Sequence, residues 1–294
     1  MEKITETVYY IPGHTNIGVI KHGENVILID SGLDDESGKR ILRALKENGL
    51  SAEALINTHS HADHCGGNKY IKERTSVEIY APEIESAVIQ APYLEPFYLF
   101  SGADPPKDLQ NRFLMAKPSE VDHVIKNEKC LLFDDVELRI IPLPGHMPKQ
   151  IGIEYGNVLF CADSVFSEDV VRKYKIPFYC NIDDTRETLM FLRNSQYKFY
   201  IPSHAEPSNS VRNLVDLNLE AIENVEKCIL DGFCEAKTTD RVLKDLCDHY
   251  QINIKGLQQY FLLNTAVSAY LSSLNKRGIL DVGVHDNTLL WIRV

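Results

Sequence analysis

The sequence lacks the features that mark secreted and membrane proteins. Its seven cysteines are odd in number and scattered, and no Cys-x-x-Cys pair occurs, so a disulfide framework is not expected. The opening residues, Met1 to Glu6, contain no apolar signal-peptide core. No apolar run approaches the roughly 18 residues that span a bilayer. These absences predict a cytoplasmic protein with reduced thiols and no membrane partner.

The sequence also lacks an excess of positive charge. Its formal net charge is −11, which argues against a general nucleic-acid binder, because neutralising phosphates needs clustered Lys and Arg. The net charge does not exclude a local basic patch. With 44% hydrophobic and 25% charged residues, the composition is that of an ordinary globular protein. A length of 294 residues suits one large α/β domain, or one domain with a small appendage.

The first part of the chain alternates between strand and helix patterns. A strand over 25–30 contains an apolar run typical of burial on both faces. A helix is predicted over 34–48, with Gly49 as its stop signal. The next strand, 54–57, leads directly into a histidine-rich segment. This order predicts a βαβ unit with a functional loop at the carboxyl end of its second strand.

Residues 92–118 interrupt this rhythm. Its five prolines are too many for one regular helix or strand, because proline cannot donate a backbone hydrogen bond. Its several aromatic residues make it too apolar for disorder. We predict an insertion packed over the surface near the mouth of a site, with a loop that packs on itself as the alternative. Further strands are then predicted over 130–133, 136–141, 151–155, 158–161 and 199–201, and helices over 183–194 and 208–230.

The end of the chain has the pattern of a small, mostly helical unit. Helices are predicted over 239–250, 255–263 and 265–277, followed by strands over 279–283 and 289–294. Three helices and a hairpin resemble a winged-helix module. The predicted division places a catalytic domain at 1–207 and a C-terminal domain at 208–294.

The strongest chemical signal is the segment Thr58 to Gly67, which reads THSHADHCGG. Three histidines and one aspartate fall within six residues, directly after an apolar strand. Imidazole and carboxylate groups are the usual protein ligands of zinc and of other divalent first-row metals. Alternation along an extended turn puts His59, His61 and Asp63 on one side. The pattern therefore predicts a metal site.

This segment resembles the His-x-His-x-Asp-His motif of the metallo-β-lactamase superfamily. Later segments match that family's remaining ligand positions in order, with His146 in a Pro-Gly-His setting, Asp163 after a hairpin and His204 after a late strand. The resemblance covers residues from about 7 to about 205. It implies an αββα sandwich, with the helical unit appended at its C-terminal end.

The resemblance also implies a ligand map and a chemistry. His59, His61 and His146 would hold one metal ion, Asp63, His64 and His204 a second, and Asp163 would bridge them. Zinc is expected, with manganese or iron as alternatives. A metal-bridging hydroxide would then attack the substrate, and Asp63 would orient it or move a proton. Some zinc β-lactamases have a cysteine at the position of Asp163. With an aspartate there, the chain resembles the glyoxalase II branch of the family.

Three residues outside the motif have weaker signals. Asp30 ends a buried strand near the expected site and is predicted to support a ligand histidine. Lys149, which departs from the family's usual sequence after Pro-Gly-His, would favour an anionic substrate, although an exposed loop lysine is the simpler interpretation. His14 is interpreted as a plain loop residue. It is one of the histidines outside the ligand map, with His22, His123, His249 and His285.

These signals favour a hydrolase with a binuclear metal site that acts on a small anionic ester, thioester or lactone. A nuclease acting on RNA or DNA is the first alternative, because the C-terminal unit resembles a nucleic-acid-binding module. An iron-dependent oxidoreductase of the same fold and a non-catalytic binding protein are the others. The sequence leaves open the substrate, the metal and whether the protein is a homo-oligomer.

Overall fold

The computed structural model describes residues 1–294 and contains two large sheets. The first sheet has the order β1-β2-β3-β4-β5-β6-β7. Its strands are β1 (Glu2–Lys3), β2 (Val8–Ile11), β3 (Ile17–His22), β4 (Asn25–Ile29), β5 (Ser51–Ile56), β6 (Glu78–Pro82) and β7 (His123–Ile125). The second sheet has the order β12-β11-β10-β9-β8. Its strands are β8 (Cys130–Phe133), β9 (Val136–Pro142), β10 (Ile151–Tyr155), β11 (Val158–Ala162) and β12 (Phe199–Pro202).

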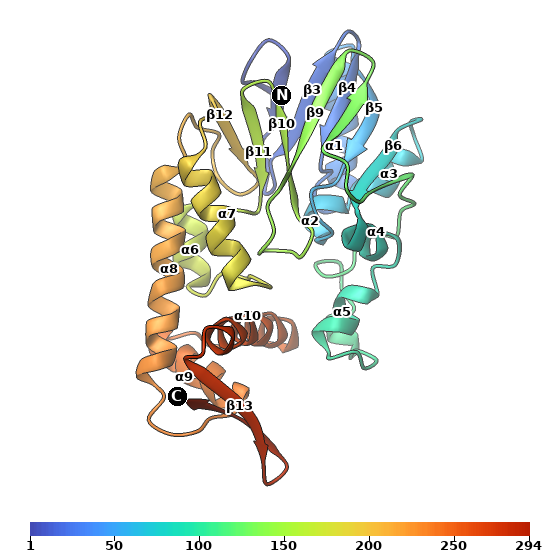
Figure 1. The fold of residues 1–294 in the computed structure, drawn as a ribbon. Coiled ribbons are helices and arrows are strands. Elements are labelled where there is room, and N and C mark those ends of the chain that lie inside the picture. Colours follow the sequence, from blue (N-terminus) through green and yellow to red (C-terminus); the bar gives the residue numbers. More distant parts are fainter.

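Helices cover the outer faces of both sheets (Figure 1). The first half of the chain contributes α1 (Asp35–Glu47), α2 (Ala62–Cys65), α3 (Asn68–Lys72), α4 (Glu83–Gln90), α5 (Leu94–Leu99) and the 3-10 turn η1 (Lys107–Leu109). The second half contributes α6 (Glu168–Tyr174), α7 (Ile182–Asn194), α8 (Arg212–Asp231), α9 (Thr239–Tyr250) and α10 (Leu257–Lys276). A separate hairpin, β13 (Leu280–His285) with β14 (Thr288–Arg293), ends the chain.

The side-chain period of the strands explains the layers. In β4, Ile27 and Ile29 point into the apolar cluster between the two sheets, while Val26 and Leu28 face the cluster beneath α1. Burial on both faces is the reason for the continuous apolar run in the sequence. A third cluster joins the outer face of the second sheet to α7, α8, α9 and α10. The result is the predicted αββα sandwich.

Most predicted elements are present, including the βαβ unit. Helix α1 lies within the predicted range 34–48, and its N-terminal cap is Asp34, whose side chain accepts a hydrogen bond from the Ser37 amide. Strand β4 pairs with β5 in parallel. The segments β6, α4, β7 and α6 have no counterpart among the predicted elements.

One prediction about the C-terminal region is wrong. The helices expected over 255–263 and 265–277 form a single helix, α10, that passes through Asn264. Its buried face runs unbroken from Leu263 through Val267 and Tyr270 to Leu274, and this packing outweighs the weak helix preference of Asn and Thr.

The C-terminal region shares its core with the rest of the chain. Leu274 of α10 lies in the same buried cluster as Leu159 of β11 and Leu189 of α7. The division at residue 207 and the winged-helix resemblance stay predictions. A membrane-spanning helix is not present, since every helix is too short or too polar for that role.

Candidate functional site

Strand direction brings the histidine-rich segment and two other loops to one edge of the first sheet. Strand β2 is antiparallel to β3, and β3 is antiparallel to β4, so β2 and β4 run the same way. Strand β5 is parallel to β4. The loops that follow these three strands therefore leave at the same edge. They carry His14, Asp30 and the segment from His59 to His64.

The second sheet delivers its residues to the same place by the same logic. Strands β9 and β11 are both antiparallel to β10, and β12 is parallel to β11. Their carboxyl ends therefore share one edge. His146 follows β9, Asp163 follows β11 and His204 follows β12. Because the sheets face each other, the two sets of loops meet between them.

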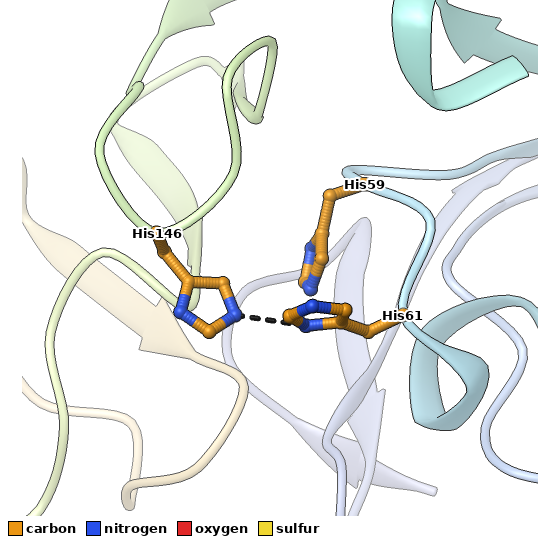
Figure 2. A group of neighbouring side chains, drawn as sticks. All are labelled: His59, His61 and His146. Carbon is orange, nitrogen blue, oxygen red and sulfur yellow. Dashed lines mark hydrogen bonds between the residues drawn. The ribbon is translucent and has the colours of Figure 1, made fainter. Parts of the chain in front are cut away.

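His59, His61 and His146 form one group of converging side chains (Figure 2). One ring nitrogen of each lies within 4.8 Å of one ring nitrogen of the others. His61 Nδ1 and His146 Nε2 are 2.9 Å apart. Imidazole nitrogens placed this way suit a single divalent ion.

Asp63, His64, His204 and Asp163 lie beside that group. His204 Nε2 is 3.3 Å from Asp63 Oδ2 and 3.3 Å from Asp163 Oδ2. His64 Nε2 is 3.3 Å from Asp163 Oδ1 and 3.9 Å from Asp63 Oδ2. Asp163 also reaches the first group, with its Oδ2 3.5 Å from His146 Nε2. The Asp163 carboxylate therefore lies close to both groups, and it forms a further group with His59 and His64.

Hydrogen bonds fix the orientation of four of the five histidine rings through Nδ1. The bonds run from His59 to Thr58 Oγ1 at 3.1 Å, from His64 to Asp30 Oδ2 at 2.8 Å, from His146 to the Phe178 carbonyl at 2.9 Å and from His204 to the His14 carbonyl at 2.8 Å. Each acceptor holds a proton on Nδ1, so Nε2 is the ring nitrogen that is directed into the site. Asp30 is predicted to support a ligand histidine, and it does hydrogen-bond to His64.

Several buried polar atoms in the site have no hydrogen bond of good geometry. They are His59 Nε2, His64 Nε2 and Asp163 Oδ1. Leaving a buried polar atom without a partner costs about 1–3 kcal/mol. Their convergence, with nitrogen and oxygen donors only, fits divalent cations of the zinc type.

The charge states divide the histidines into two classes. Burial lowers the pKa of His59 and of His146, and it lowers the pKa of His61 to about 3, with the neighbouring His146 adding to the effect. These three imidazoles are neutral and ready to coordinate. Burial would also lower the pKa of His204, but Asp163 outweighs it and raises that pKa to about 10. The two carboxylates thus hold a proton that a metal ion would displace.

A buried glutamate that the sequence did not single out connects two of the ligand loops. Glu85 Oε2 accepts hydrogen bonds from the Ser60 hydroxyl at 2.6 Å and the Ser60 amide at 3.2 Å, and Oε1 accepts from the Lys149 amide at 3.2 Å. It therefore ties the loop of His61 to the loop after His146. The Lys149 side chain is exposed. Helix α4, which carries Glu85, had no clear signal in the sequence.

The segment 92–118 packs against the C-terminal region. Leu99, Leu109 and Leu114 form a small buried cluster, against which Phe261 and Leu262 of α10 pack. Helix α10 also contacts α7, so it crosses the end of the sandwich where the ligand loops lie (Figure 1). The same segment carries Glu95, a buried carboxyl whose Oε2 has no hydrogen-bond partner. Burial raises the pKa of Glu95 well above its ordinary value.

Solved structures share this fold over nearly the whole chain. A metallo-beta-lactamase family protein from Thermus thermophilus matches with a TM-score of 0.75 and 16% identity, covering 99% of each chain. A beta-lactamase domain protein from Burkholderia ambifaria matches with a TM-score of 0.73 and 15% identity, covering 99% of this chain and 93% of the other. At these identities the likeness concerns the fold, and it includes the C-terminal helices.

Curated relatives match a shorter part. Hydroxyacylglutathione hydrolases from Brucella ovis and Brucella abortus are each 26% identical over 171 residues, which is 57% of this chain and 54% of theirs. The chain thus spans about half the length of the curated relatives it matches. The family model described as the metallo-beta-lactamase superfamily matches residues 10–204, which include all seven predicted ligand positions. The chain therefore belongs to the metallo-β-lactamase superfamily.

Proposed function

We propose that this protein is a metal-dependent hydrolase of a small ester, thioester or lactone. The observation that carries the proposal is the convergence of five imidazoles and two carboxylates, with unpartnered buried donor atoms, at the meeting point of the two sheets. The name of the curated relatives, hydroxyacylglutathione hydrolase, supports hydrolysis of an acylated small molecule. An anionic substrate stays part of the proposal.

In the proposed ligand map, one ion is held by His59, His61 and His146. A second is held by Asp63, His64 and His204, with Asp163 shared between them. The map is supported by the mutual distances within the first group and by the position of Asp163 between the groups. Nitrogen and oxygen donors without thiolate suit zinc, and also manganese and iron.

Two divalent ions bound here would supply an activated water and a Lewis acid for the scissile carbonyl. The residues of the chain would orient the reactants and manage the proton. Asp63 is the carboxylate suited to that task, because 26% of its side chain is exposed, whereas Asp163 is 5% exposed. Thr15 fixes Asp63 by donating a hydrogen bond to Oδ2 at 3.1 Å.

The charge of Asp63 supports this role. Burial would raise its pKa, but His64 and His204 outweigh that effect and hold the pKa below its ordinary value. Asp63 is therefore an anion that can accept a hydrogen bond from a water molecule and orient it, while the proposed proton transfer rests on its position and exposure. Replacing Asp63 with Asn would keep the shape and remove the base.

A substrate screen on metal-loaded protein tests the proposal. Protein reconstituted separately with zinc, manganese and iron would be offered thioesters, aryl esters, lactones and a phosphodiester. We expect turnover of at least one acyl substrate that disappears on addition of a chelator and returns with metal. The matched variants are His146→Ala, which removes a proposed ligand, and His123→Ala, which removes an exposed histidine outside the site.

The outcomes separate the alternatives. Turnover of the phosphodiester alone would favour a nuclease, and oxygen-dependent chemistry with iron would favour an oxidoreductase. Absence of metal-dependent turnover on every substrate would overturn the proposal. If Asp63→Asn binds two ions and retains full turnover, the proton role of Asp63 is wrong.

A further inference from the structure

We propose that His14, on the loop between β2 and β3, is an additional ligand of the second metal ion and holds it from the solvent side. This inference rests on the binuclear site of the proposed function. It assigns a metal-binding role to a histidine that the sequence pattern treats as a plain loop residue.

The first support is geometric. One ligand atom each of His14, Asp63 and His204 lies within 4.8 Å of the others, which makes them a group able to share one ion. His14 Nδ1 is 3.8 Å from Asp63 Oδ2, and the His14 and His204 rings meet edge to face with centroids 5.3 Å apart. At 3.8 Å Asp63 does not accept a hydrogen bond from His14 Nδ1, so this nitrogen is not committed to the carboxylate.

The second support is that contacts on both sides hold this loop against the site. Asn16 donates side-chain hydrogen bonds to the Pro202 and Ala205 carbonyls, at 3.0 and 2.8 Å, on either side of His204. Before His14, Arg40 donates to the Pro12 carbonyl at 3.0 Å. A Cβ atom at Gly13 would lie 2.6 Å from the Arg40 guanidinium, so this side chain packs closely against the loop.

The third support is that the backbone of His14 already serves the same metal position. Its carbonyl accepts the Nδ1 proton of His204 at 2.8 Å and directs His204 Nε2 toward Asp63. The side chain and the carbonyl of one residue therefore face one cluster. The His14 side chain is 78% exposed, so its ring can close onto an ion that arrives from solvent without moving the fold.

Titration with cobalt(II) tests this inference, because cobalt binds zinc-type sites and its visible spectrum reports the number and kind of ligands. Metal-free wild-type protein, His14→Ala and a control variant, His285→Ala, would be titrated in competition with a chelator. His285 is an exposed histidine on the terminal hairpin. The His14→Ala variant retains the backbone carbonyl, so only the side-chain donor is lost.

We expect two cobalt ions per wild-type chain. In His14→Ala, the first equivalent should bind as in the wild type, while the second should bind about 10-fold or more weakly and give a changed spectrum. His14→Asp, which puts an oxygen donor near the position of Nδ1, should restore most of the affinity. His285→Ala should behave as the wild type.

Two results would overturn the inference. One is an unchanged affinity and spectrum for the second ion in His14→Ala, which would leave the proposed hydrolase intact. The other is binding of at most one ion by the wild type, which would remove the second site itself. If the His14 effect is present but no substrate is hydrolysed, the inference stands and the proposed function fails.

Discussion

The Asp30→Asn substitution is the sharpest probe of how the site is built. Asp30 is 2% exposed and accepts three hydrogen bonds, from the Thr58 amide to Oδ1 at 2.8 Å and from the Thr58 hydroxyl and His64 Nδ1 to Oδ2, each at 2.8 Å. Its φ is +66°, a conformation that Asn also tolerates. The variant should therefore fold with the native backbone.

The magnitude follows from counting donors and acceptors. If the amide oxygen faces the Thr58 amide, the Asn NH2 group donates to His64 Nδ1, which forces the ring proton onto Nε2, the proposed ligand atom. If the amide is flipped, the NH2 group faces the Thr58 N–H and one buried donor is left without a partner. The metal-free variant can adopt the first arrangement, whereas binding of the second ion requires the flipped one. The unpartnered donor then costs about 1–3 kcal/mol, which corresponds to a loss on the order of 10- to 100-fold in affinity for the second ion.

Metal titration in competition with a chromophoric chelator measures this loss. The control is Asp122→Asn, which removes a carboxylate that accepts the Ile79 amide at 2.7 Å but lies outside the site. We expect normal binding of both ions in the control and weakened binding of the second ion in Asp30→Asn. Wild-type affinities for both ions in Asp30→Asn, with an unchanged circular dichroism spectrum, would refute this account of how His64 is oriented.

Three other substitutions test separate parts of the structure. Gly145→Ala should displace His146 and weaken the first ion about 10-fold or more, because Gly145 has φ +126° and a Cβ atom there would lie 2.4 Å from Thr185 Oγ1; normal titration of the first ion would contradict this. Glu95→Gln should stabilise metal-free protein increasingly as the pH rises above 4.5, the ordinary value from which burial raises the pKa of Glu95, because the folded wild type holds that proton more tightly than the unfolded chain does. Urea unfolding at pH 5 and pH 8 measures the difference, and an equal effect at both would argue against it. Tyr270→Phe should leave the stability unchanged or raise it by up to about 1 kcal/mol, since its buried hydroxyl has no partner; a loss of more than that in urea unfolding would reveal an unseen partner.

Local patterns made much of the fold predictable. The continuous apolar run of β4 and the helical pattern that stops at Gly49 are short-range signals, and the structure follows them. The wrong boundary inside α10 also has a local cause, because Asn264 and Thr265 are weak helix formers. The helix continues through these residues because Leu263, Val267 and Tyr270 pack against the rest of the molecule. This packing cannot be read from the local sequence pattern.

The sequence by itself determined the chemistry that this protein has available, because the motif from His59 to His64 and the later His146, Asp163 and His204 are identified by residue type and by the strands that precede them. Only the tertiary structure decided which atoms meet. Strand direction in two separate sheets brings these loops to one place, and residues with no motif of their own, His14 and Glu85, enter the site because their neighbours in space are distant in sequence. Contacts between loops depend on how both sheets pack, so they are a property of the folded molecule rather than of any one segment.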